Sequence, residues 1–143
     1  DPLVGFLRPI APISAARLEG RSINLPDIDE RVKKISQNCL DQDVRFVVEG
    51  LGGAMVPLAN GYGIADWISD LAFPAIVVCR TELGTISHTT LVIESLKKRG
   101  VNILAIVASR TQTGEMTEVE KASVTEINEQ NPSIPIMVLD YLN

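Results

Sequence analysis

Short apolar runs that alternate with segments of helical periodicity constrain the fold of this chain more than any other feature. The runs 75–79, 103–108 and 135–139 are typical of buried parallel strands, and the spacing of apolar residues predicts helices over 85–99 and 117–130. Strands separated by helices are typical of parallel sheets, because a parallel connection needs a long crossover. We therefore expect an α/β fold with a doubly wound, mostly parallel sheet and flanking helices.

The first half of the chain is less regular. Three prolines predict an extended, irregular segment over 1–13. Beyond it the pattern predicts a helix over 27–41, a strand over 44–49, a loop over 50–63 and a short helix from Ile64 to Leu71. At 143 residues the whole chain, 1–143, is expected to form a single domain.

Composition argues against several function classes. The net charge is −5 and no basic cluster is interleaved with aromatic residues, so the footprint of a nucleic-acid-binding protein is missing. The longest apolar run, around Ala75–Cys79, is far shorter than the roughly 20 residues of a membrane-spanning helix. Cys39 and Cys79 lack the spacing of a zinc site or a disulfide framework, which favours a reducing, cytoplasmic compartment.

The first candidate site is Glu49 with the glycines that follow it. Ligands of open α/β sheets collect beyond the carboxyl ends of strands, where Glu49 is expected, and a bound magnesium ion would compensate its charge. The alternative is a Glu that pairs with an arginine or caps a neighbouring helix. Gly50, Gly52 and Gly53 would let phosphates approach the backbone, but such clusters also form plain turns, and no GxxxxGK[ST] pattern is present.

The second candidate site is the helix start at Leu83–His88. Free backbone N–H groups and the positive end of the helix dipole could receive a phosphate or carboxylate there, aided by the hydroxyls of Thr85 or Ser87. Ordinary capping by the same hydroxyls is the alternative.

Two further residues could be reactive. His88 is the only histidine and has no evident nucleophile or metal partner, so we interpret it as structural. Arg80 could lower the pKa of the Cys79 thiol, although a buried, inert cysteine is the commoner case. No nucleophilic triad can be assembled from the sequence.

Four segments, in this order and spacing, resemble dethiobiotin synthetases. They are APISAARLEGR at 11–21, VVEGLGGAMVPL at 47–58, ADW at 65–67 and LGTISHTTL at 83–91. The resemblance covers essentially the whole chain and corresponds to the C-terminal two-thirds of such an enzyme. It implies a P-loop α/β fold related to ParA/MinD-type ATPases.

The resemblance also implies an activity. Members of the family work as cytoplasmic homodimers in biotin biosynthesis and use ATP and Mg²⁺. They carboxylate 7,8-diaminopelargonic acid with CO₂, activate the carbamate by phosphoryl transfer and close the ureido ring. Protein groups in phosphoryl transfer mainly position the reactants and neutralise charge.

Carried over residue by residue, the resemblance assigns three groups. Glu49 would bind magnesium, and ATP would be bound by Glu49, Gly50, Leu51, Gly52, Ser109, Arg110, Asp140, Tyr141 and Leu142. The substrate carboxylate would be received, across the dimer interface, by Gly84, Thr85, Ile86 and Ser87. The family's Walker A loop and catalytic lysines are expected upstream of Asp1, so the chain alone is expected to be inactive.

Several positions depart from the family pattern. Ser109-Arg110 stands where the family has its adenine-recognising Asn, and Val138–Tyr141 replaces a Gly-x-x-Pro segment. Ile13 replaces a His, and Ser87 an Asn. An alternative hypothesis is therefore a non-catalytic relative that acts as a binding or assembly partner without nucleotide binding.

Overall fold

A computed structural model of the chain describes residues 4–141. The chain divides into two compact units at the boundary between Trp67 and Ile68, and each unit is described by itself. Among the described residues no helix is both long enough and apolar enough to cross a membrane.

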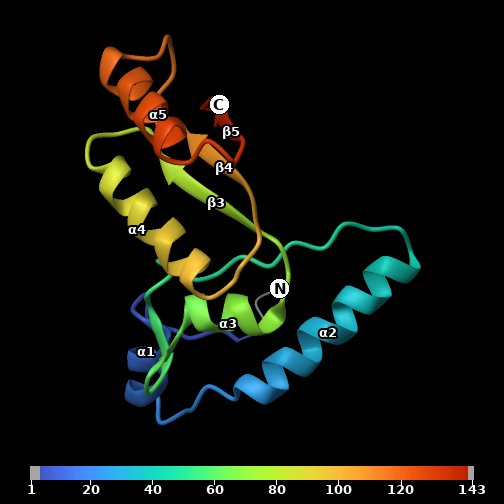
Figure 1. Cartoon of the computed structure of the whole chain (residues 1–143). Coiled ribbons are helices and arrows are strands. Elements are labelled where there is room, and N and C mark those ends of the chain that lie inside the picture. Colours follow the sequence, from blue (N-terminus) through green and yellow to red (C-terminus); the bar gives the residue numbers. More distant parts are fainter. Residues whose placement is uncertain (1–3, 142–143) are drawn as a thin grey trace. The chain divides into compact units, whose positions relative to one another are not determined.

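Unit 1 contains two helices, a short hairpin and the start of a third helix (Figure 1). Their bounds are α1 (Pro12–Leu18), α2 (Leu25–Asp41), β1 (Pro57–Ala59), β2 (Tyr62–Gly63) and α3 (Ile64–Leu71). Proline begins α1 and lies in the first turn of α2, where its missing N–H costs no helical hydrogen bond. The strands β1 and β2 are antiparallel, and α1 packs against β1.

The core of unit 1 is small. Ala15 of α1 and Val32 of α2 are completely buried. Trp67 of α3 is also buried, and its indole N–H donates to Asp29 of α2 at 2.6 Å, which satisfies the polar end of an otherwise apolar ring.

Unit 2 is a three-stranded parallel sheet with helices packed on it (Figure 1). Its elements are β3 (Ala75–Arg80), α4 (Thr85–Lys98), β4 (Ile103–Ser109), α5 (Glu118–Gln130) and β5 (Ile136–Leu139), with strand order β3-β4-β5. Helix α4 packs on β3 and β4, and α5 packs beside α4. The predicted α/β class with a parallel sheet and flanking helices is confirmed.

The core of unit 2 lies between β4 and the two helices. Ile106 at the middle of β4 is completely buried, and Ile93 of α4 and Ile127 of α5 are 2% and 1% exposed. Apolar residues at this spacing give each helix one buried stripe, which explains why the periodicity predicted both helices.

Most predicted elements are confirmed to within two residues. These are the helices over 27–41, 64–71, 85–99 and 117–130 and the strands over 75–79, 103–108 and 135–139. The irregular segment predicted over 1–13 is confirmed only for 4–11, because α1 begins at Pro12, and residues 1–3 lie outside the described part. The loop predicted over 50–63 contains β1 and β2.

The predicted strand over 44–49 is wrong. This segment is irregular in the structure and belongs to neither sheet, and Val47 is 84% exposed. A run of β-favouring residues becomes a parallel strand only when neighbouring strands accept its hydrogen bonds and cover its faces. The two described sheets provide no such neighbour, so the local preference is not realised.

Shortening a buried side chain at the centre of unit 2 should lower the stability of the fold. We expect Ile106→Ala to lower the free energy of unfolding by about 2–5 kcal/mol, because it removes buried methyl groups and leaves a cavity in the middle strand. The matched control is Leu104→Ala on the same strand, whose side chain is half exposed, and it should cost much less. Urea denaturation measures both, and equal losses would contradict this description of the core.

Candidate functional site

Glu49 lies on an exposed irregular segment of unit 1, followed by the glycine loop. No hydrogen bond or ion pair of the described residues involves its carboxylate, so the alternative of an arginine-paired or helix-capping Glu finds no support. An acid that is exposed and unpaired is available to a ligand. The sequence predicted that Glu49 lies at the end of a strand, and this prediction is wrong because no strand forms over 44–49.

The glycines after Glu49 have structural reasons of their own. Gly52 has a φ of +73°, a conformation that other residues adopt at a cost, and a Cβ there would meet Val56 at 3.0 Å. A Cβ on Gly50 would come within 3.2 Å of Ile64. At Gly52 the local chain path thus favours glycine even without a phosphate ligand, which supports the alternative of a plain turn.

The residues of the ADW segment also have structural roles. Asp66 accepts a hydrogen bond from the backbone N–H of Gly63 at 2.7 Å, just before α3 begins. Trp67 contacts Asp29 as described above. Both residues fix the start of α3 within unit 1.

The start of α4 has the geometry of an anion site. Gly84 is the N-cap residue with a φ of +93°, and no side chain caps the helix. The buried Thr85 hydroxyl instead donates to the Arg80 carbonyl at 2.6 Å, while Ser87 is exposed. Side-chain capping by Thr85 or Ser87 is therefore wrong. The Thr85 N–H is bonded to the Glu82 carbonyl at 3.1 Å, so the N–H groups of Ile86 and Ser87 are the ones with the capacity to bind an anion.

A hollow of about 370 Å³ adjoins this helix start. It runs along β3 and the first turns of α4, and Arg80, Glu82, Thr85 and His88 contribute to its lining. His88 is exposed and Cys79 half-buried. The Arg80 guanidinium and the Glu82 carboxylate are 3.8 Å apart, and Glu82 also accepts a hydrogen bond from the Thr111 hydroxyl, so these two charges are partly balanced beside the helix start.

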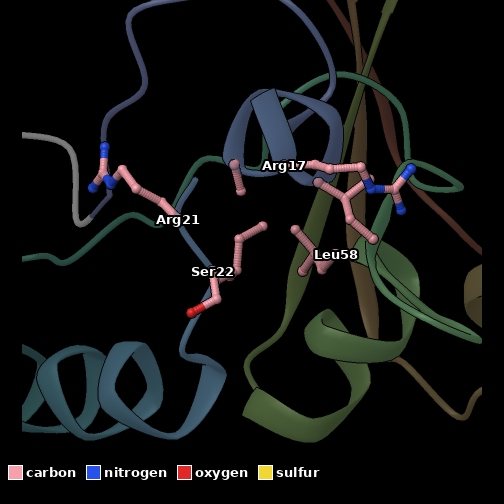
Figure 2. A pocket seen from close by; sticks show the side chains of 7 residues that line it. Arg17, Arg21, Ser22 and Leu58 are labelled. Atoms are coloured by element: carbon pink, nitrogen blue, oxygen red, sulfur yellow. The ribbon is translucent and has the colours of Figure 1, made fainter. Parts of the chain in front are cut away.

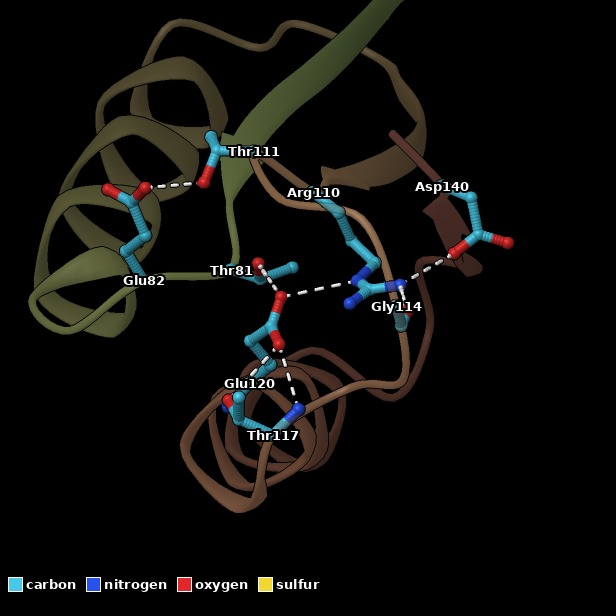
Figure 3. A network of polar contacts seen from close by, with 8 residues as sticks. All are labelled: Thr81, Glu82, Arg110, Thr111, Gly114, Thr117, Glu120 and Asp140. Atoms are coloured by element: carbon cyan, nitrogen blue, oxygen red, sulfur yellow. Dashed lines mark hydrogen bonds and ion pairs between the residues drawn. The ribbon is translucent and has the colours of Figure 1, made fainter. Parts of the chain in front are cut away.

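A polar network joins the carboxyl ends of all three strands of unit 2 (Figure 3). Glu120 of α5 accepts hydrogen bonds from the Thr81 hydroxyl at 2.8 Å and from Arg110 Nε at 3.2 Å. Arg110 Nη1 donates to Asp140 Oδ1 at 3.1 Å and to the Gly114 carbonyl at 2.7 Å. Because Thr81, Arg110 and Asp140 directly follow β3, β4 and β5, one arginine and one glutamate hold three strand ends together.

Glu120 also caps its own helix. Its second carboxylate oxygen accepts the Thr117 N–H at 2.8 Å, and the Thr117 hydroxyl accepts the Glu120 N–H, which forms a capping box. The bond from the Thr117 backbone, followed by those from Thr81 and Arg110, lowers the pKa of Glu120 to about 2. The carboxylates of Asp140 and Glu120 raise the pKa of Arg110 above its ordinary value.

The structure brings some of the expected site residues together. Arg110 and Asp140 are in contact, whereas Ser109 is half-buried and Tyr141 exposed at the ends of their strands. Gly84–Ser87 lie in unit 2, as do Arg110 and Asp140, whereas Glu49–Gly52 belong to unit 1. Leu142 is outside the described residues.

Thr81 and Glu120 were not predicted as members of this edge. The T-x-x-E pattern Thr117–Glu120 indicates the helix cap from sequence alone. The contacts of the same glutamate with Thr81 and Arg110 are long-range and leave no local pattern.

A second hollow, of about 270 Å³, lies in unit 1 between α1 and β1 (Figure 2). Its lining is mainly apolar and includes Ile13, Ala16 and Leu58. The guanidinium groups of Arg17 and Arg21 extend away from its centre on opposite sides, so only their stems line it. Arg21 is engaged by the Gly5 carbonyl and by Glu19. The hollow contains no acid or base aimed at a ligand.

A magnesium ion would have to rely on few protein ligands. Within residues 4–141 no three His, Cys, Asp or Glu side chains gather as a metal site. Mg²⁺ commonly takes only one or two carboxylates and completes its octahedron with waters and phosphate oxygens. The exposed, unpaired carboxylate of Glu49 fits that role as a single protein ligand.

The Glu120 network predicts an acid-sensitive stability. The Glu120 pKa is lower in the folded chain than in the unfolded chain, so its contribution is fully present above about pH 4.5 and is lost as the pH falls toward 2. Glu120→Gln should remove that part of the pH dependence, whereas Glu118→Gln, an exposed neighbour on α5, should leave it unchanged. Denaturant unfolding at stepped pH values measures this. The same slope in wild type and Glu120→Gln would contradict it.

Comparison with known proteins identifies the relatives of this chain. A protein-family model described as an AAA domain matches residues 3–138. The chain is 43% identical to the ATP-dependent dethiobiotin synthetase BioD of Bacillus licheniformis over 102 residues, which are 71% of this chain and 42% of that protein.

Two other proteins of the same name extend the similarity. That of Anaeromyxobacter sp. strain K is 42% identical over 106 residues (74% of this chain, 46% of that protein). That of Methanocaldococcus jannaschii is 32% identical over 118 residues (82% and 55%). The chain spans about half the length of the curated relatives it matches. With the parallel α/β sheet described above, the match over 3–138 shows that the chain belongs to the AAA-domain family, and its curated relatives there are dethiobiotin synthetases.

Proposed function

We propose that this chain is part of a dethiobiotin synthetase, an ATP-dependent ligase that closes the ureido ring of dethiobiotin from 7,8-diaminopelargonic acid and CO₂. The structural observation that carries the proposal is the start of α4, where Gly84 leaves the first-turn N–H groups without a side-chain cap beside a hollow. A carboxylate is the ligand that such a helix start favours. The substrate has one at the end of its alkyl chain.

Each residue at this helix start has a different role in the proposed carboxylate site. Gly84 lets the backbone turn into the helix, and Thr85 fixes that turn through its bond to the Arg80 carbonyl. Ile86 is half-buried and Ser87 exposed, so the Ser87 hydroxyl can add one hydrogen bond to a bound carboxylate. Orienting the carboxylate in this way would place the distant amines for reaction.

We assign the metal and phosphate side of the site to Glu49 and to the backbone of Gly50, Leu51 and Gly52. The exposed carboxylate without a protein partner supports this, since it can approach a magnesium ion that bridges nucleotide phosphates. Magnesium, when bound, would neutralise charge on the phosphates of ATP.

The base end of the ATP site is proposed at Ser109, Asp140 and Tyr141, with Leu142 beyond them. Arg110 has a different part there. It is 7% exposed and its Nε and Nη1 groups donate to Glu120, Gly114 and Asp140, so we assign it the positioning of Asp140. The side chain of Asp140 remains 80% exposed and keeps one carboxylate oxygen for a ligand.

The remaining features of the family complete the proposal. We propose a cytoplasmic homodimer in which the carboxylate-binding helix start faces a neighbouring subunit's site. The chain would be part of one α/β domain whose P-loop and catalytic lysines are supplied by sequence outside these 143 residues.

The function is tested with the full-length gene product that contains this chain. Incubated with 7,8-diaminopelargonic acid, bicarbonate, ATP and Mg²⁺, it should form dethiobiotin and ADP, detected by mass spectrometry. The 143 residues alone should form neither. ATP turnover without dethiobiotin, or the absence of both from the full-length protein, would refute the proposal.

Removing the charge of Glu49 should impair the use of magnesium. In the full-length protein we expect Glu49→Gln to raise the Mg²⁺ concentration for half-maximal activity by about 10- to 100-fold, the range seen when groups around a metal are altered. The fold should be spared because the side chain is exposed and unpaired. Glu30→Gln, another exposed acid of unit 1, on α2, is the control. An unchanged Mg²⁺ requirement would exclude Glu49 from the metal site.

One observation favours a second candidate function. At the position of the family's adenine-recognising Asn, the Arg110 side chain is buried and its Nε and Nη1 groups are bonded within unit 2. A non-catalytic relative that serves as a binding or assembly partner would also have an arginine bonded to other protein groups at this position. Calorimetric titration of the full-length protein with ATP and Mg²⁺ distinguishes the two, because this alternative predicts no binding.

A further inference from the structure

One carboxylate at the strand ends of unit 2 is bonded on one side only. Asp140 directly follows β5, and its Oδ1 accepts a hydrogen bond from Arg110 Nη1 at 3.1 Å. Among the described residues no hydrogen bond engages the other oxygen, Oδ2, which points away from Arg110 in Figure 3. Ligands of open α/β sheets collect beyond the carboxyl ends of the strands, so Asp140 lies where a ligand can meet its second oxygen.

The place of this carboxylate is fixed from the interior of unit 2. The Arg110 backbone N–H donates to the Leu139 carbonyl at 2.9 Å, which holds the main chain just before Asp140 beside β4. The Arg110 side chain is 5% exposed, and Glu120 and the Gly114 carbonyl accept hydrogen bonds from its Nε and Nη1. A guanidinium that is held at several points gives the carboxylate a defined orientation. One edge of Asp140 is therefore anchored, and the other is presented to a ligand.

The chemistry of a carboxylate restricts which nucleobase it can bind. A carboxylate accepts hydrogen bonds and donates none, whereas an amide side chain offers one acceptor and one donor. The Watson–Crick edge of adenine is mixed, with the donor N6–H next to the acceptor N1, so it matches an amide and sets the N1 lone pair against a carboxylate. Guanine is the base that offers two adjacent donors, N1–H and N2–H. Asp140 is therefore complementary to guanine.

We infer that Asp140 is a specificity-determining residue of the nucleotide site and that it makes GTP at least as good a phosphoryl donor as ATP. This inference rests on the proposed function, which assigns Ser109, Asp140 and Tyr141 to the base end of that site. The carboxylate of Asp140 accepts the two donors of guanine, and Arg110 is the positioning residue that holds it. The exposed ring of Tyr141 can stack on any base and adds affinity without selection.

The reaction itself is unchanged by the base. The γ-phosphoryl group passes to the carbamate oxygen as the bond to the β-phosphate oxygen breaks, and GDP leaves in place of ADP. The base lies outside these steps, so it affects binding of the nucleotide and not the bonds that form and break.

The test measures kcat/KM for dethiobiotin formation with GTP and with ATP in the full-length gene product, at one Mg²⁺ concentration. We expect the ratio of GTP to ATP to be about one or higher. Asp140→Asn should lower this ratio by about tenfold or more, because the amide loses an acceptor for guanine and gains a donor for N1 of adenine. Asp140→Glu keeps a group that only accepts, so it should retain more of the ratio than Asp140→Asn.

Two further variants serve as control and as a test of positioning. Glu129→Gln removes the same charge from an exposed residue of α5 and should change the ratio by less than about twofold. Arg110→Lys should lower the ratio, because an ammonium lacks the planar fork that bonds Glu120 and Asp140 together. A purely structural arginine would affect stability and leave the ratio unchanged, which would overturn its positioning role. The exposed Asp140 variants decide the specificity even where Arg110→Lys does not fold.

Two results overturn the inference. One is a wild-type protein that prefers ATP, and the other is the same ratio in wild type and Asp140→Asn. Calorimetric titration of the full-length protein with non-hydrolysable GTP and ATP analogues and Mg²⁺ should show the GTP analogue binding at least as tightly, and Asp140→Asn reversing that order.

The titration separates this inference from the proposed function. Dethiobiotin formed with ATP and not with GTP would leave the proposed function intact and overturn the inference. If neither nucleotide supports dethiobiotin formation, the proposed function is refuted, and the order of the two affinities then decides the inference by itself. Binding of neither analogue would overturn both.

Discussion

The carboxyl edge of the sheet in unit 2 depends on the ion pair between Arg110 and Glu120. Both side chains are nearly buried, 5% and 12% exposed, and neither could be left there alone without a large loss of solvation. Thr81 and Thr117 donate further hydrogen bonds to Glu120, and the Gly114 carbonyl accepts one from Arg110, so each charged group has several partners. Because these partners follow β3, β4 and precede α5, the pair fixes the loops from which a ligand site would be built.

Elements in which local preference and tertiary environment agree were predictable. The helices α4 and α5 and the strands β3, β4 and β5 have regular spacing, clear end signals and a place in one sheet. Segment 44–49 has an equally strong preference for β structure, but a strand also needs neighbouring strands. Whether such neighbours are present cannot be predicted from the residues of the segment itself. Helix α1 is not predicted because proline in general disfavours regular structure, whereas proline at the first helical position is compatible with a helix start.

The candidate site was predictable only where a short pattern carries it. The glycine before α4 indicated a helix start able to bind an anion, and the structure adds that Thr85 is bonded to Arg80 and does not cap the helix. The family resemblance assigns Arg110 to the ATP site. Arg110 contacts Glu120 and Asp140, which are 10 and 30 residues away in the chain. Contacts between residues so far apart cannot be predicted from a local periodicity or motif.

Segment 44–49 and the exposed sheet residues Ile76, Val78 and Met137 share an apolar, β-favouring composition without full burial. Each has the composition of a buried parallel sheet, and each lacks, within the described residues, the strands or helices that such composition requires. The AAA-domain match and the greater length of the curated relatives are consistent with further elements of the fold outside this chain. The exposed apolar residues therefore have the composition of strands that are buried in a parallel α/β sheet.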